Sequence, residues 1–152
     1  MKNRHIFIFV LTIVVFLSAC SSTFSNTQIG NNDWEYDMKN GYEIWHVNAR
    51  SIVCGKRNTA HSLSNVGGDY VVKFYYNTQH VFLQCVDVPE DINEEINFSN
   101  PLFYIIDAKT DEVLGPLSEQ EFEEALTNTI DFKESVLWIN TKPRPEGAKF
   151  PE

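Results

Sequence analysis

Residues 70–88 constrain the fold of this chain more than any other segment. Two runs rich in aromatic and β-branched residues, 70–76 and 80–88, flank the short polar connection Asn77-Thr78-Gln79. This arrangement predicts a β-hairpin. Both runs place apolar residues on both faces of the predicted strand, which is typical of strands that are covered on each side. We therefore expect this hairpin to lie at the centre of a sheet.

Shorter segments on either side extend the predicted sheet. Alternating apolar and polar residues, or short apolar runs, predict strands at 34–38, 42–47, 51–55, 102–106, 112–114 and 136–139. Residues 56–69 carry Asn, Thr, Ser and Gly67-Gly68 without sustained periodicity, which predicts a surface loop. The expected fold class is mainly β (α+β): a small antiparallel sheet or meander of about six to seven strands with one C-terminal helix.

A helix start is encoded just after Gly115-Pro116. Ser118 as N-cap and Glu121 three positions later form a capping box, and Leu117 can pack on Phe122 as a hydrophobic staple. The pattern predicts a helix of two to three turns that buries Phe122 and the apolar residues that follow it on the same face.

The first twenty residues have the layout of an export signal. Lys2 and Arg4 precede an apolar run at positions 6–17 that only Thr12 interrupts. The run has 12 residues, whereas a transmembrane helix needs about 17–25, so it indicates the apolar region of a secretory signal peptide. It leads into Leu17-Ser18-Ala19-Cys20, the lipobox pattern at which bacterial lipoproteins are cleaved and lipidated.

Cys20 is therefore the predicted lipidation site. Cleavage before it removes residues 1–19, and a diacylglycerol on its thiol then holds the chain at the extracytoplasmic face of the membrane. The alternative is an ordinary signal peptide that ends beside a cysteine. Composition predicts a flexible tether at 20–32, a β-rich globular domain at 33–139 and a disordered tail at 140–152, which holds three prolines.

Charge limits the classes of partner. The full chain has a net charge of −9, and the predicted mature chain has −11, because residues 1–19 hold Lys2, Arg4 and no acidic residue. Such a charge argues against nucleic acid and against electrostatic adhesion to anionic lipid headgroups. The lipid on Cys20 is expected to provide the membrane attachment.

Two further cysteines, Cys54 and Cys85, lie in apolar, strand-like segments. A free cysteine in such surroundings behaves as a small apolar side chain, which favours two buried thiols. A disulfide between them is the alternative, because exported proteins often carry disulfides. The choice depends on the distance between the two Cα atoms, which spacing along the chain does not give.

The side chains that could support catalysis or bind a metal are scattered. No two of the mature histidines, His46, His61 and His80, lie within four positions of each other, and no Cys/His cluster has zinc spacing. A thiol–imidazole pair would need Cys54 or Cys85, and both are expected in the core. No nucleophile elbow or phosphate-binding loop is present. We therefore expect no metal, cofactor or catalytic residue, and no enzyme.

Two other groups of side chains have a structural and a functional interpretation. The acidic run at 90–95 lacks the register of a calcium loop, which favours a solvated acidic loop. Trp34, Trp45 and Trp138, with the tyrosines of 70–76, would form an aromatic recognition face if they were exposed. Packing within a small domain is the favoured interpretation.

Five segments together resemble a known family. They are Asn40-Gly41-Tyr42-Glu43, Tyr76-Asn77, Tyr104-Ile105-Ile106-Asp107, Leu114-Gly115-Pro116-Leu117 and Glu121-Phe122. In this order they are similar to a family of small bacterial lipoproteins, most familiar from Gram-positive bacteria, that carries a domain of unknown function. The resemblance covers residues 34–126. It implies a lipid anchor and a small β-rich domain, and it brings no established activity.

These observations predict a lipid-anchored exported lipoprotein, most simply a non-enzymatic module that binds another protein of the envelope. The alternative is an immunity or inhibitor-type protein that uses its negative charge to neutralise a basic toxin or enzyme. An enzyme of unrecognised type ranks third.

Overall fold

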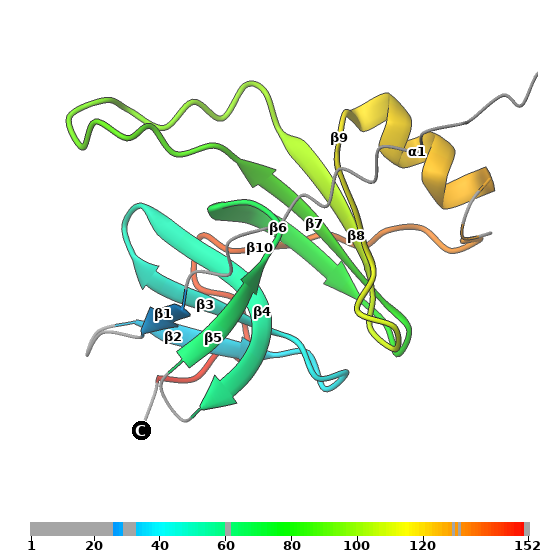
Figure 1. The fold of residues 1–152 in the computed structure, drawn as a ribbon, viewed down its shortest axis with the longest axis horizontal. Coiled ribbons are helices and arrows are strands. Elements are labelled where there is room, and N and C mark those ends of the chain that lie inside the picture. The colour runs from blue at the N-terminus through cyan, green and yellow to red at the C-terminus, as the bar shows by residue number, and fades with distance from the viewer. Residues whose placement is uncertain (1–25, 29–32, 60–61, 129, 131, 151–152) are drawn as a thin grey trace, which may run out of the picture.

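The computed structural model describes residues 26–28, 33–59, 62–128, 130 and 132–150. They form ten strands and one helix (Figure 1). The elements are β1 (Asn26–Gln28), β2 (Trp34–Asp37), β3 (Glu43–Asn48), β4 (Ser51–Thr59), β5 (Ser62–Val66), β6 (Tyr70–Tyr76), β7 (His80–Val86), β8 (Leu102–Asp107), β9 (Val113–Leu117), α1 (Glu119–Asn128) and β10 (Ile139–Asn140). The predicted signal peptide and lipobox lie outside the described residues.

One sheet carries the fold. Its main path runs β1-β5-β4-β6-β7-β8-β9, while β3 also pairs with β4, β2 pairs with β3, and β10 pairs with β6. The pairings between described strands are antiparallel except at one contact, where Ile52 of β4 lies beside Tyr70 of β6. There the sheet divides into an N-terminal half, β1–β5, and a meander, β6–β9 (Figure 1). The mainly β class with one helix is confirmed, with more strands than expected.

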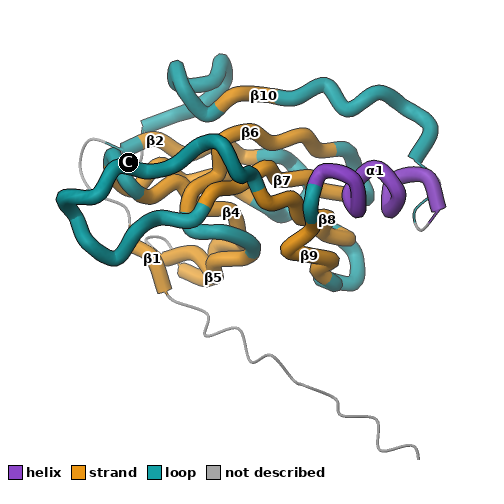
Figure 2. The backbone as a smooth tube through the Cα atoms, turned by 90° about the horizontal axis from the view of Figure 1, so that it is seen from above, coloured by secondary structure: helices purple, strands orange, loops and turns teal. Residues whose placement is uncertain are grey.

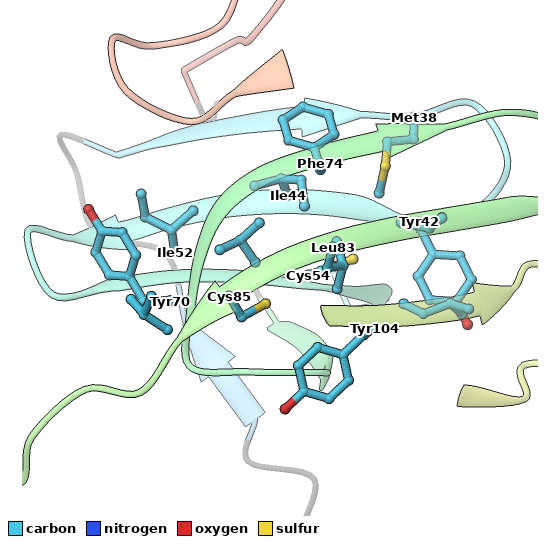
Figure 3. Packing of buried hydrophobic residues seen from close by; sticks show 14 of the residues in the cluster. Met38, Tyr42, Ile44, Ile52, Cys54, Tyr70, Phe74, Leu83, Cys85 and Tyr104 are labelled. Atoms are coloured by element: carbon cyan, nitrogen blue, oxygen red, sulfur yellow. The ribbon is translucent and has the colours of Figure 1, made fainter. Parts of the chain in front are cut away.

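The hairpin of β6 and β7 lies at the centre, as predicted. Leu83 and Cys85 of β7 point into the central core cluster, between the meander and the N-terminal half (Figure 3). Val81 of the same strand belongs to this cluster too. Phe82 points to the opposite face and packs in a second cluster, here called the helix-side cluster, with Phe122 of α1. Successive residues of a strand face opposite ways, so the continuous apolar run corresponds to burial on both faces.

Helix α1 begins with the predicted capping box. The Ser118 N–H donates to Glu121 Oε2 at 2.8 Å, and the Glu121 N–H donates to Ser118 Oγ at 3.3 Å. The helix buries Phe122, Ala125 and Leu126. Leu117 packs against the same helix-side cluster, as expected for a hydrophobic staple.

The predicted surface loop at 56–69 is wrong. β4 continues to Thr59 and pairs with β5, which occupies Ser62–Val66. Leu63 is the only fully buried residue of β5, and the sequence of this strand accordingly contains no apolar run. The strand is held by backbone pairing with β4 rather than by burial of its side chains. Gly55 permits this pairing, because a Cβ atom there would lie 1.9 Å from the Ser64 carbonyl oxygen.

The disordered tail expected from Asn140 onward is also wrong. Residues 132–145 run from the end of α1 across the sheet, and β10 pairs with β6 on the way (Figure 2). Thr141 is buried, and its Oγ1 donates to the carbonyls of Val71 and Val72 at 2.8 and 3.0 Å. Lys149 exchanges two backbone hydrogen bonds of 2.8 Å with Glu35. Strand edges need partners for their backbone groups, and this low-hydrophobicity tail supplies them.

Two smaller expectations change in the same way. Of the last predicted strand, 136–139, only Ile139 is in a strand, while Val136 and Trp138 pack against the helix-side cluster. Within the predicted tether, Asn26–Gln28 forms β1, which pairs with β5. Both changes arise from tertiary pairing that a short segment does not reveal by its own periodicity.

The capping box gives a first prediction. Ser118→Ala removes the acceptor of the Glu121 N–H and is expected to lower the free energy of unfolding by about 1 kcal/mol. Urea denaturation followed by tryptophan fluorescence measures this change. Ser99→Ala, in an exposed loop, is the control and is expected to leave the midpoint unchanged. Equal midpoints for the two variants would contradict the cap.

Candidate functional site

The two cysteines of the domain are free and fully buried. The alternative disulfide is therefore not formed. Burial raises the pKa of the Cys85 thiol to about 12, and burial together with the nearby Cys85 raises that of Cys54. A thiolate is the reactive form of cysteine, so these protonated, enclosed thiols are core side chains.

Most of the aromatic residues also belong to the core. Trp34 and Trp45 are buried, and Trp138 packs on Phe103 and Phe122. The aromatic recognition face is therefore not formed by these tryptophans, and core packing is confirmed for them.

The described histidines occupy separate sites. His46 Nδ1 lies 3.2 Å from Asp33 Oδ1, and its ring stacks on Trp34. His80 is at the start of β7, opposite Asp107 of β8. His61 and Cys20 lie outside the described residues. Within the part of the chain that the structure describes, no three His, Cys, Asp or Glu side chains are grouped so as to hold a metal ion.

The turn between β8 and β9 organises the candidate site. Asp107 Oδ1 accepts the N–H groups of Lys109 and Thr110 at 2.7 and 3.0 Å. Its N–H donates to the Glu112 carbonyl at 2.9 Å and closes the turn. Asp111 completes the turn with φ of 63°, in the left-handed region that non-glycine residues rarely occupy. The turn thereby aims the Asp111 carboxylate at the N-terminal half of the sheet.

Three side chains from distant parts of the chain meet there. Asp111 Oδ1 is 2.5 Å from Lys56 Nζ on β4, and it accepts a 3.0 Å hydrogen bond from the Tyr42 hydroxyl. Lys56 Nζ also lies 5.0 Å from the centre of the Tyr42 ring. We call Tyr42, Lys56 and Asp111 the seam cluster, because it joins the N-terminal half of the sheet to the meander. Ser64, Val66 and Val113 complete a cleft of about 300 Å³ around it.

The charges of the seam cluster favour recognition over proton transfer. The Lys56 ammonium, with the Tyr42 hydroxyl, holds the pKa of the Asp111 carboxyl below its usual range. Burial and the hydrogen bond to Asp111 raise the pKa of Tyr42. General acid–base catalysis works best with a pKa near the operating pH. Both pKa values move away from pH 7. At that pH the cluster therefore presents the Asp111 carboxylate and the Tyr42 hydroxyl beside the Lys56 ammonium.

A second cleft, of about 590 Å³, lies on the helix-side face of the same hairpin. It is lined by His80, Ile105, Asp107, Glu112, Val113, Leu114 and Ile130. Val113 and Leu114 are 42% and 40% exposed, a large exposure for neighbouring apolar residues. The cleft thus combines an apolar floor with two carboxylates. Neither cleft was predicted from the sequence, because the lining residues are brought together only by strand pairing.

The acidic loop has an order that its composition does not predict. The guanidinium of Arg50 donates to the carbonyls of Pro89, Asp91, Ile92 and Glu94 at 2.7–3.3 Å. These bonds hold the loop in one conformation beside the β3–β4 turn. Ile92 is 77% exposed, so the loop presents an apolar side chain among carboxylates.

Comparisons with known proteins give no relative. No protein-family model matches this chain, and no curated protein or solved structure is significantly similar to it. The resemblance to the small lipoprotein family therefore stays a prediction. Among the described residues there is no helix with the length and apolar character needed to cross a membrane.

The seam cluster predicts a pH dependence. Because the pKa of Asp111 is lowered in the folded state, its contribution to stability is present above the ordinary carboxyl pKa and is lost as pH falls through the lower folded value. Asp111→Asn should therefore lower the denaturation midpoint at neutral pH, and its difference from wild type should shrink below about pH 4. Asparagine tolerates the left-handed conformation. Asp69→Asn, at an exposed site, is the control; a pH-independent difference for Asp111→Asn would contradict the ion pair.

The Arg50 contacts predict a change in loop order. Arg50→Met keeps an apolar stem and removes the donors, and the rate of cleavage after Glu90, Glu94 and Glu95 by a glutamate-specific protease should rise by about tenfold. Arg144→Met, at an exposed site, is the matched control. Equal cleavage rates in the two variants would show that Arg50 does not order the loop.

Proposed function

We propose that this chain is a lipid-anchored lipoprotein of a bacterial envelope whose domain binds another protein at the extracytoplasmic face of the membrane. The observation that carries this proposal is Leu17-Ser18-Ala19-Cys20 directly after a short apolar run with a basic start. A diacylglycerol on Cys20 would keep the domain at the membrane without a spanning helix.

The surface of the domain supports a binding role rather than a reaction. In the seam cluster, the pKa values of Tyr42 and Asp111 both move away from pH 7. Cys54 and Cys85 are buried. Two clefts flank an exposed apolar strand. Exposed apolar surface with a polar rim is typical of protein-binding sites.

The anchor is tested by Cys20→Ala. In a bacterial host grown with a labelled fatty acid, the full chain is expected to incorporate label, and Cys20→Ala to lose it and to move from the detergent phase to the aqueous phase on partition. Ser21→Ala is the matched control and should keep the label. Unchanged labelling of Cys20→Ala would contradict the lipid anchor.

A second candidate function is neutralisation of a basic toxin or enzyme. The acidic loop held by Arg50 favours it, because a loop that is ordered before binding loses less entropy when it binds. The carboxylates around Ile92 would complement a basic surface.

Crosslinking in intact cells, followed by identification of the captured protein, separates these functions. The binding role predicts one dominant envelope partner. Neutralisation predicts a basic partner whose association rate falls steeply with salt. Absence of any crosslinked partner would contradict both.

A further inference from the structure

One edge of strand β9 has no strand beside it in the part of the chain that the structure describes. Among the described strands its only partner is β8. The Asp107 N–H donates to the Glu112 carbonyl, which is one of the two bonds of a hydrogen-bonded pair at this register. The turn replaces the other, because the Asp107 carbonyl accepts the Asp111 N–H. Such pairs alternate with non-hydrogen-bonded pairs in antiparallel sheets. The next pair, Ile106 and Val113, is therefore of the second kind, and the N–H and C=O of Val113 point outward.

The two faces of this edge open onto different clefts. Val113 pairs with Ile106, whose side chain lies in the central core cluster, and it borders both the 300 Å³ cleft of the seam cluster and the 590 Å³ cleft. Leu114 pairs with Ile105 of the helix-side cluster and lines the 590 Å³ cleft. A strand added beside β9 would send alternate side chains to opposite faces. Its side chains would therefore enter the two clefts in turn.

The charges of the helix-side cleft define what fits. Asp107 and Glu112 lie opposite each other on neighbouring strands, and both carboxylates line this cleft. The N–H groups of Thr110 and Lys109 hold the pKa of Asp107 below its usual range, so this carboxylate stays charged. His80 is the neighbouring titratable group in the cleft. A cationic side chain in this cleft would be attracted by both carboxylates.

We propose that the outer edge of β9 binds an extended segment of a partner protein by strand addition, and that this segment carries Lys or Arg followed two positions later by an apolar residue. The cation lies at Asp107 and Glu112, and the apolar side chain lies beside Leu114 and Ile130 on the same face. The proposal rests on the binding role proposed above and assigns its site.

The length and charge of the edge argue against a second copy of this chain as the occupant. Gly115, with φ of 140°, bulges the strand, and Pro116 lacks an N–H, so a long self-pairing edge is not available. Two copies would also bring Asp107 and Glu112 of each chain together at a net charge of −9 per chain. A short basic segment from another protein satisfies both constraints.

The test uses the isotope-labelled mature chain in detergent micelles and two capped peptides, Ser-Thr-Arg-Thr-Val-Thr-Ser and the same peptide with Glu in place of Arg. The arginine peptide is expected to shift the amide signals of Glu112, Val113 and Leu114 and to bind at least about fivefold more tightly than the glutamate peptide. Val113→Pro removes the outward N–H and should weaken binding by about two- to tenfold. Val113→Thr retains that N–H and the β-branched shape, and serves as the control.

Charge reversal gives a second measurement that does not depend on Val113→Pro folding. Glu112→Lys should reverse the preference between the peptides, whereas Glu123→Lys, exposed on α1, should leave it unchanged. Equal binding of both peptides, unchanged preference in Glu112→Lys, or signal shifts confined to residues 87–100 would overturn the proposal. If cells yield a crosslinked partner equally with wild type and with Glu112→Lys, the edge site is wrong and the binding role stands.

Discussion

Burial of β7 on both faces is the interaction on which the rest of the structure depends. Leu83 and Cys85 anchor the central cluster, where the N-terminal half of the sheet packs over the meander. Phe82 anchors the helix-side cluster, where α1 and the C-terminal segment cover the other face. Full burial of a side chain the size of Leu83 or Phe82 contributes about 1.5–3 kcal/mol. The central cluster and the helix-side cluster, on opposite faces of the sheet, therefore share strand β7.

Strand β9, at the end of the main path of the sheet, is exposed, whereas β8 beside it is buried. The chain covers the edge of β6 with β10 and Thr141, and it pairs the edge of β2 with Lys149. β9 receives no strand of this kind among the described residues. Gly115 and Pro116 instead lie at a bulge in it, and its edge at Val113 and Leu114 lies between two clefts of different chemistry.

The elements predicted well are those whose signals are local. The capping box of Ser118 and Glu121 needs only residues three positions apart, and the hairpin of β6 and β7 needs only two apolar runs with a short connection. β5 and the C-terminal segment were missed, because their order comes from backbone hydrogen bonds, with the preceding strand β4 for β5 and with distant strands for the C-terminal segment. Composition describes side chains and carries no information about such partners.

The sequence by itself determined the class of the domain, its central hairpin, its helix start and the expectation of a lipid on Cys20, because each depends on short-range patterns of apolar and capping residues. Only the tertiary structure decided the site. Tyr42, Lys56 and Asp111 come from segments up to 69 residues apart, and Arg50 reaches a loop about 40 residues away. Contacts of this kind depend on the order and the register of the strands. The register of β8 and β9 also places the N–H and C=O of Val113 on the outer edge of β9, between the 300 Å³ and the 590 Å³ clefts.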